Sequence, residues 1–132
     1  MIEFKNQEFD FLFSCPPYYD LEKYSDDIND LSNMDYDHFK SKYRSIIFKA
    51  SKLLKKGDYA CFVISEVRGK DGFYINFIGE TIKAFRLAGC GYYNDAVLLN
   101  TIGSAAIRAN RQFRAGQKLV RLHQNVLVFK KL

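Results

Sequence analysis

The chain has 132 residues, 48% of them hydrophobic and 16% aromatic, which predicts a single domain with a packed core and argues against disorder. No apolar run approaches the roughly 18 residues of a membrane span, and no basic stretch followed by an apolar run opens the chain, so we expect neither a membrane segment nor a secretion signal. The formal net charge is +5, and three cysteines without CxxC spacing disfavour disulfides and a zinc site and indicate a reducing, cytoplasmic setting.

The first predicted element is a strand over residues 9–14, whose dense aromatic and branched side chains are typical of a strand buried on both faces. Pro16 and Pro17 end it, because neither can donate a hydrogen bond to a neighbouring strand. The chain then presents Tyr18 and Tyr19. Ligands of open α/β sheets bind where the chain leaves the carboxyl ends of strands. Residues 14–19, here called the Pro-Pro-Tyr turn, are therefore a candidate site for a flat, polar, aromatic ligand such as a nucleobase.

Residues 19–35 are polar and acidic, and they are interpreted either as a flap over this site or as a disordered connection. A helix is predicted over residues 35–56, because apolar residues recur there at three- and four-residue steps and Gly57 follows. The recurring apolar residues are Phe39, Tyr43, Ile46, Ile47, Ala50, Leu53 and Leu54.

Nearly continuous apolar sequence predicts a central strand over residues 59–65, and a second helix is predicted over residues 73–88. Strand, helix and strand in this order favour parallel strands joined by a right-handed crossover. A third strand is predicted over residues 90–100, with Val97, Leu98 and Leu99 in the core. A last strand over residues 123–130 has no helix before it, so the last two strands are expected to form an antiparallel hairpin.

Residues 101–122 between these two strands are predicted as a long basic loop. Residues 96–132 contain seven Lys or Arg and no acidic residue, whereas residues 1–95 contain 13 Lys or Arg against 15 Asp or Glu. A one-sided basic segment indicates a polyanionic partner, and a solvated surface loop is the alternative. His123 could reach a phosphate or make a structural hydrogen bond. The candidate phosphate contacts are Arg108, Arg111, Arg114, Lys118 and Arg121.

Both ends of the chain carry a resemblance to a known family. The run Cys15-Pro16-Pro17-Tyr18, the following Tyr19-Asp20-Leu21-Glu22 and the closing residues 123–131 resemble the S-adenosylmethionine-dependent DNA amino-methyltransferases, in their phage and prophage branch. The family has Asp, Asn or Ser where this chain has Cys15. The resemblance runs over nearly the whole chain but only over the second half of the family's domain, so residues 1–132 are expected to be a partial methyltransferase domain without the glycine-rich cofactor turn. It implies a Rossmann-like α/β methyltransferase half-domain.

The resemblance also implies an activity, which is methyl transfer from S-adenosylmethionine to the exocyclic amino group of adenine or cytosine in DNA. The implied catalytic residues are Cys15, Pro16, Pro17 and Tyr18. The Cys15 side chain and the Pro16 carbonyl would accept hydrogen bonds from the amino group, and Tyr18 would stack on the extruded base. Ser14 and Cys15 would contact the cofactor, and Tyr19 and the basic residues the DNA. A thiol is a weak hydrogen-bonding group, so Cys15 would bind the amino group only weakly. Three consequences are open: the Pro16 carbonyl provides most of the orientation, Ser14 replaces Cys15 as the second acceptor, or activity is lost.

Other functions remain open at this point. A nucleophilic Cys15, as in the carbon-5 cytosine methyltransferases, is disfavoured because the proline follows the cysteine and no His or Asp partner is evident. The chain is then a fragment, a split-enzyme subunit or an inactive remnant of a DNA methyltransferase, a non-catalytic nucleic-acid-binding or accessory module, or an enzyme acting on RNA or protein. An open apolar edge at residues 9–13 predicts a homodimer or a cofactor-binding partner chain.

Overall fold

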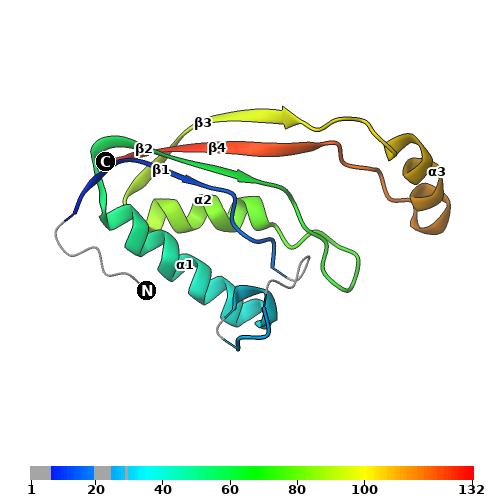
Figure 1. Ribbon diagram of the computed structural model, residues 1–132, viewed down its shortest axis with the longest axis horizontal. Coiled ribbons are helices and arrows are strands. Elements are labelled where there is room, and N and C mark those ends of the chain that lie inside the picture. The colour runs from blue at the N-terminus through cyan, green and yellow to red at the C-terminus, as the bar shows by residue number, and fades with distance from the viewer. Residues whose placement is uncertain (1–6, 20–24, 29) are drawn as a thin grey trace.

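The computed structural model describes residues 7–19, 25–28 and 30–132, which form a sheet, two helices on one face of it, and a third helix at the end of a long hairpin (Figure 1). The strands are β1 (Phe9–Ser14), β2 (Leu54–Ile64), β3 (Cys90–Leu99) and β4 (His123–Lys131). The helices are α1 (Tyr36–Lys52), α2 (Phe77–Leu87) and α3 (Ala105–Gly116), with a short 3-10 helix η1 (Leu31–Asn33) before α1. Within the described ranges, none of the helices combines the length and apolar character needed to span a bilayer.

The four strands lie in the order β1-β2-β4-β3. β1 pairs with β2 in parallel, whereas β4 pairs antiparallel with both β2 and β3. The predicted α/β class, the parallel first pair and the closing antiparallel hairpin are therefore confirmed. The order leaves β1 and β3 as the two edges of the described sheet.

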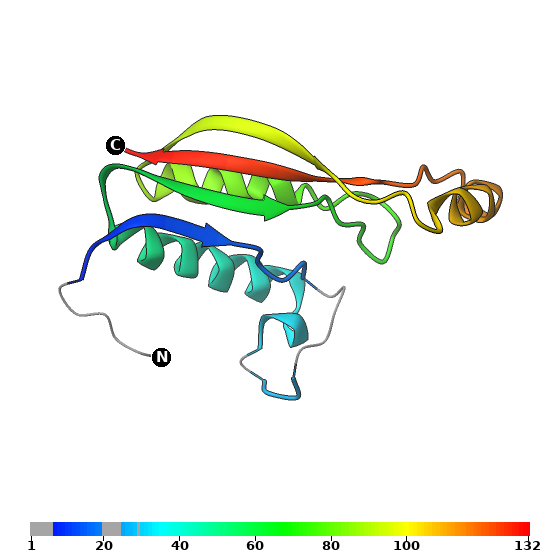
Figure 2. The same ribbon diagram turned by 45° about the horizontal axis from the view of Figure 1, so that its top comes forward.

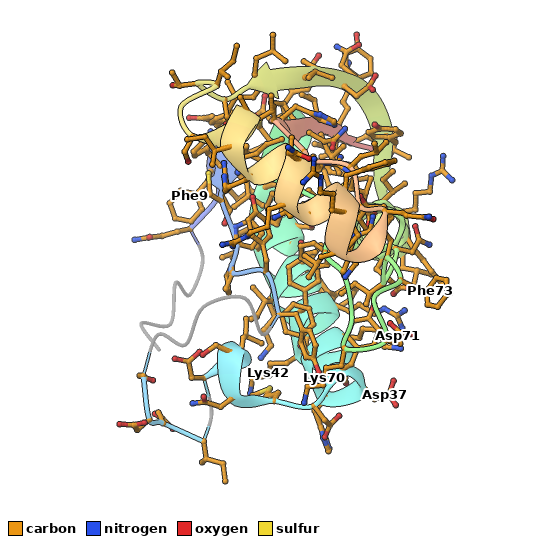
Figure 3. All side chains as sticks on the ribbon, turned by 90° about the vertical axis from the view of Figure 1, so that its right-hand side faces the viewer. Phe9, Asp37, Lys42, Lys70, Asp71 and Phe73 are labelled. Atoms are coloured by element: carbon orange, nitrogen blue, oxygen red, sulfur yellow. The ribbon has the colours of Figure 1, made fainter. Side chains whose placement is uncertain are left out.

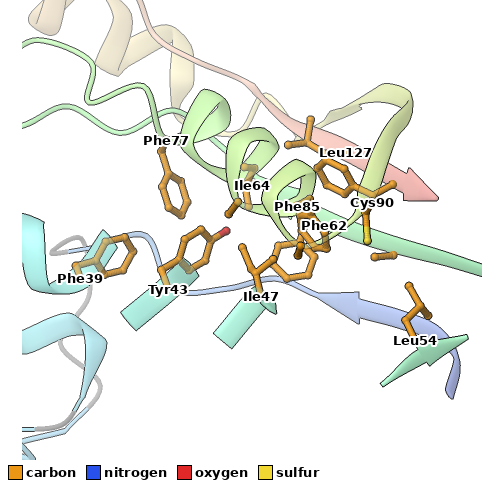
Figure 4. Close-up of a cluster of buried hydrophobic side chains, with 14 of the residues drawn as sticks. Phe39, Tyr43, Ile47, Leu54, Phe62, Ile64, Phe77, Phe85, Cys90 and Leu127 are labelled. Carbon is orange, nitrogen blue, oxygen red and sulfur yellow. The ribbon is translucent and has the colours of Figure 1, made fainter. Parts of the chain in front are cut away.

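The core lies between the sheet and the two helices α1 and α2 (Figure 4). Alternate residues of the central strands point toward the helices, so Phe62 of β2 and Phe129 of β4 both contact Phe85 of α2, with ring centroids 4.9 and 4.0 Å away. The expected apolar face of α1 is confirmed at its centre, because Phe39, Tyr43 and Ile47 are buried. This aromatic layer holds the carboxyl ends of β1 and β2 in place.

Two helix boundaries differ from the prediction. α1 ends at Lys52, and β2 already begins at Leu54, so the lysines and turn predicted to close the helix belong to the strand. Pairing with β1 explains this, since the Phe9 amide donates to the Leu53 carbonyl at 2.8 Å and Gly57 absorbs the irregular register with a φ of +89°. α2 begins at Phe77 rather than at residue 73, because Asn76 adopts a φ of +59°.

The prediction that residues 9–13 are buried on both faces is wrong for this chain. Leu12 packs against the core, but Phe11 and Phe13 lie on the opposite side and are 57% and 59% exposed. Helices α1 and α2 both lie on the same face of the sheet (Figure 2), and the part of the chain that the structure describes places no helix on the other face. The expected core positions of β3 are wrong as well, because Val97, Leu98 and Leu99 are all exposed, so the described residues cover neither face of this end of the edge strand.

The predicted basic loop is also wrong in part, because its middle is α3. The segment contains four alanines, at positions 105, 106, 109 and 115, and its arginines are good helix formers as well. Only Ala105 of this helix is buried, so α3 stands beyond the ends of β3 and β4 and away from the core (Figures 1 and 2). The predicted flap has η1 near its end, and its residues 20–24 and 29 lie outside the described part of the chain.

Candidate nucleobase site and nucleic-acid surface

The Pro-Pro-Tyr turn leaves the sheet where three strand ends meet. Ser14 at the end of β1 pairs with Phe62, and Ile64 at the end of β2 pairs with Asn125 near the start of β4. The carboxyl ends of the two parallel strands thus lie beside the amino end of β4. This is the edge at which open α/β sheets bind ligands.

Tyr18 is held from two sides at this edge. Its hydroxyl accepts a hydrogen bond from the Gln124 side-chain nitrogen at 2.7 Å. Its ring meets Phe77, the first residue of α2, edge to face, with 6.1 Å between centroids and an interplanar angle of 87°. Tyr18 is only half-buried, so β4 and α2 orient the ring while part of it stays open to solvent.

Tyr19 turns in a different direction from its neighbour. Its φ of +51° is unusual for a bulky residue. The ring packs edge-on against Tyr36 and Phe39, at centroid distances of 5.2 and 5.4 Å. The strained backbone therefore lets two consecutive tyrosines reach two different helices, and it fixes the direction in which the turn leaves the strand.

A cavity of about 350 Å³ lies beside the turn, lined by Cys15, Pro17, Asp30 and Leu31. This size falls within the range of small-molecule sites. Hydrogen bonds from Ser25 and then from Ser32 hold the pKa of Asp30 below its ordinary value of 3.8, so the carboxylate stays charged. The cavity thus combines a thiol, a proline ring and a negative charge, and it can receive a ligand group that is flat or that donates hydrogen bonds.

The predicted basic residues do not gather around Tyr18. Arg108, Arg111 and Arg114 are exposed on α3, which lies beyond the strand ends and away from the turn (Figures 1 and 2). Lys118 follows α3 and is also exposed. Arg121 is half-buried, and its guanidinium donates to the Asn125 side-chain oxygen at 2.6 Å, which braces the start of β4. The turn and the basic helix are consequently two separate surfaces joined by the β3–β4 hairpin.

Sequence reasoning missed Gln124, Phe77 and Glu66. The Glu66 carboxylate accepts hydrogen bonds from the amides of Phe77 and Ile78 at 3.1 and 2.9 Å, so it caps α2 and fixes the residue against which Tyr18 packs. An acidic residue directly after a buried strand can indicate a side chain that caps the next helix. Because the sequence predicts that helix to start at residue 73 rather than at Phe77, Glu66 is not recognised as its cap. No group of three or more metal-binding side chains occurs within residues 7–19, 25–28 and 30–132.

Comparison with family models finds no match, and neither does comparison with curated proteins. Several solved structures do match. TTHA0409 of Thermus thermophilus, assigned as a DNA modification methylase, aligns in its complex with S-adenosyl-L-methionine with a TM-score of 0.63 at 12% identity, over 96% of this chain and 48% of that one. Another structure of TTHA0409 gives 0.62 at 14% identity, over 92% and 45%. The complex of M1.HpyAVI with SAM gives 0.56 at 11% identity, over 96% and 46%.

These likenesses establish the fold. The chain is a Rossmann-like α/β unit that matches these three structures over most of its own length, and two of the three contain S-adenosylmethionine. It spans less than half the length of each of those structures.

Proposed function

We propose that this chain is the nucleobase-binding half of a DNA methyltransferase that methylates the exocyclic amino group of adenine or, alternatively, cytosine. The observation that carries the proposal is Tyr18, held by Gln124 and Phe77 at the carboxyl end of β1 beside the cavity of Cys15 and Pro17. The fold supports it, because its neighbours include DNA modification methylases. Under this proposal, residues 1–132 are a partial methyltransferase domain.

Each residue of the turn has a role in this reaction. Tyr18 stacks on a base that has left the duplex, and the Pro16 carbonyl accepts a hydrogen bond from its amino group. Pro17 keeps the turn rigid, and Cys15 or Ser14 supplies the second, weaker acceptor. The amino nitrogen would form the new bond to the methyl carbon as the carbon–sulfur bond of the methyl donor breaks, and its surplus proton would leave to solvent. S-adenosylmethionine supplies the methyl group when it is bound.

The described residues do not fit the whole cofactor. Ser14 and Cys15 offer one contact surface, but β1 and β2 continue into Cys15-Pro16-Pro17 and Ser65-Glu66-Val67 rather than into a glycine-rich turn. A further segment must supply the remaining contacts. The described residues of this chain are therefore not assigned the binding of the cofactor.

The edge of β1 is where such a segment would join. Among the described strands β1 pairs only with β2, and its exposed phenylalanines lie beside a mostly apolar cavity of about 330 Å³. Open apolar strand edges favour pairing with another strand. The proposed occupant is a cofactor-binding partner chain or a second copy of this chain. The residues that line the cavity are Phe9, Phe11, Leu12, Phe13, Ala50, Leu53 and Leu54.

A labelled-methyl assay tests the function. The chain, alone and with its cofactor-binding partner, is incubated with labelled S-adenosylmethionine and with DNA, RNA or peptide. Transfer to DNA that is lost in Tyr18→Ala but kept in a control variant, Tyr93→Ala on β3, supports the proposal. Transfer to RNA or peptide alone, or DNA transfer that is unaffected by Tyr18→Ala, would refute it.

A second candidate function is a non-catalytic nucleic-acid-binding module. Cys15 in the signature position and the absence of a glycine-rich turn after either described parallel strand favour it. Titration calorimetry separates the two functions. DNA binding without any heat from S-adenosylmethionine, in the presence and absence of a partner, supports the module.

A further inference from the structure

Residues 67–75, between β2 and α2, form a short hairpin that the candidate site does not use. The Ile75 amide donates to the Val67 carbonyl at 3.0 Å, and the Gly69 amide donates to the Phe73 carbonyl at 2.8 Å. The turn closes through the Gly72 amide, which donates to the Gly69 carbonyl at 2.9 Å, and Gly72 has a φ of +84° that favours glycine. The hairpin is therefore a defined structure, although it has little core of its own.

This hairpin exposes two aromatic side chains. Phe73 is 74% exposed and Tyr74 is 48% exposed. Phe73 points away from the body of the protein, as Figure 3 shows. The Arg68 guanidinium lies over the Tyr74 ring, 4.0 Å from its centroid, and donates to the Gly72 carbonyl at 2.7 Å. Exposed aromatic rings on an ordered turn beside a cation are the groups that stack nucleobases.

A groove separates the hairpin from the C-terminal end of α3. It has a volume of about 380 Å³ and is lined by Arg68 from the hairpin and by residues of the α3 end. The two sides meet at Lys118, because a Cβ atom on Gly72 would lie 3.6 Å from the Lys118 ammonium. The lining residues from the α3 side are Gln112, Ala115, Gly116, Lys118 and Leu119.

The charges of this groove favour an anion. Arg68 and Lys118 contribute one cation from each side, and residues 96–132 contain no acidic residue. The single carboxylate of the hairpin tip, that of Asp71, accepts a hydrogen bond from the Phe73 amide at 3.1 Å. A phosphate backbone in the groove would have a cation on each side, and next to Arg68 it would meet the Tyr74 ring that this guanidinium covers.

Both walls of the groove also lead directly to Tyr18. The hairpin runs into α2, whose first residue, Phe77, contacts the Tyr18 ring. The segment after α3 runs into β4, whose second residue, Gln124, binds the Tyr18 hydroxyl. A strand that leaves the groove along residues 119–123, toward the start of β4, would reach the Pro-Pro-Tyr turn.

We propose that this groove binds the DNA strand that carries the target base, with Phe73 and Tyr74 stacking on neighbouring bases and Arg68 and Lys118 contacting phosphates. The inference rests on the proposed function for the identity of the polyanion as DNA. It adds a second aromatic contact surface, outside the Pro-Pro-Tyr turn, and it assigns a role to a hairpin that has none otherwise.

Fluorescence anisotropy with the full chain tests this. The probes are a labelled single-stranded oligodeoxynucleotide, the same strand with abasic positions, and an RNA of the same sequence. Phe73→Ala should weaken binding to the intact strand by about 5- to 150-fold, the range expected for one lost stacking contact. Phe73→Ala should have little effect on the abasic strand. The control is Phe48→Ala, which removes an exposed aromatic ring from α1.

Arg68→Ala and Lys118→Ala should each reduce the salt slope of binding by about one phosphate contact. A Phe73→Ala variant that binds the intact and abasic strands as the unaltered chain does would overturn the inference and leave the methyltransferase proposal standing. No binding of DNA by the unaltered chain would overturn both, and tighter binding of RNA than of DNA would reassign the groove and count against DNA as substrate.

Discussion

The hydrogen bond between Gln124 and Tyr18 gives the sharpest test of the candidate site. The two atoms lie 2.7 Å apart, and both side chains are half-buried. A bond of this kind contributes about 0.5–1.5 kcal/mol to the free energy of unfolding. Tyr18→Phe removes the hydroxyl but keeps the edge-to-face contact with Phe77, and Gln124→Leu removes the donor at nearly constant size. We expect each change to cost about 1 kcal/mol.

A double-mutant cycle isolates the bond. Urea unfolding of the unaltered chain, both single variants and the double variant gives four free energies of unfolding. If the hydroxyl and the amide interact as the distance indicates, the double variant should cost little more than either single one, with a coupling energy of about 0.5–1.5 kcal/mol. Costs that simply add, within about 0.3 kcal/mol, would refute the idea that Gln124 fixes Tyr18.

Three further outcomes are expected. Replacing Arg108 and Arg114 of α3 by Glu should weaken DNA binding and flatten its salt dependence. The same change at Lys42 and Lys49 of α1 should alter the salt slope less. If the α3 variant and the α1 variant have equal salt slopes, α3 is not part of the interface. Phe11→Lys should abolish any concentration-dependent association in sedimentation, because it places a charge on the exposed edge of β1, whereas Phe48→Lys should not; association that persists in Phe11→Lys would move the interface elsewhere. The side-chain hydrogen bond to Asp35 raises the pKa of His38 above 6.5, and the hydrogen bonds from the backbone amide and then the ring of His38 lower the pKa of Asp35 below 3.8. This contribution to stability should be full between pH 3.8 and pH 6.5, and it should be lost as the pH rises through the raised pKa of His38 or falls through the lowered pKa of Asp35. His38→Gln should remove the loss on the alkaline side in urea unfolding.

The elements predicted best from the sequence are those whose signal is local. The three- and four-residue steps of α1 place Phe39, Tyr43 and Ile47 on one face, and these residues are buried in the core. The end of β1 follows from the rule that prolines do not donate to a neighbouring strand. The antiparallel hairpin of β3 and β4 follows from the absence of a predicted helix between them. In such cases neighbouring residues carry the whole argument.

The failures come from information that neighbouring residues do not contain. The failure at α3 has a different cause, since its alanines and arginines do favour a helix, but only Ala105 is buried and the segment has no long apolar face, so its charge alone predicts a loop. Gln124 escapes prediction as a partner of Tyr18 because 106 positions separate them, and only the sheet order brings them together. Long-range contacts of this kind follow from topology rather than from residue type.

The exposed residues of β1 and β3 lie on the two edge strands of the described sheet, where β1 is covered on one face and the end of β3 on neither. Apolar runs such as 9–13 and 97–99 are typical of strands covered on both faces, yet the described helices cover one face only. Leu12 is packed against the core while Phe11 and Phe13, on either side of it, face outward. Burial of these exposed aromatic side chains against another segment would be favourable, because it removes apolar surface from water. This is the physical reason for expecting a partner segment on β1. The same segment would stand next to Ser14 and Cys15, where the proposed reaction needs the cofactor contacts that the described residues lack.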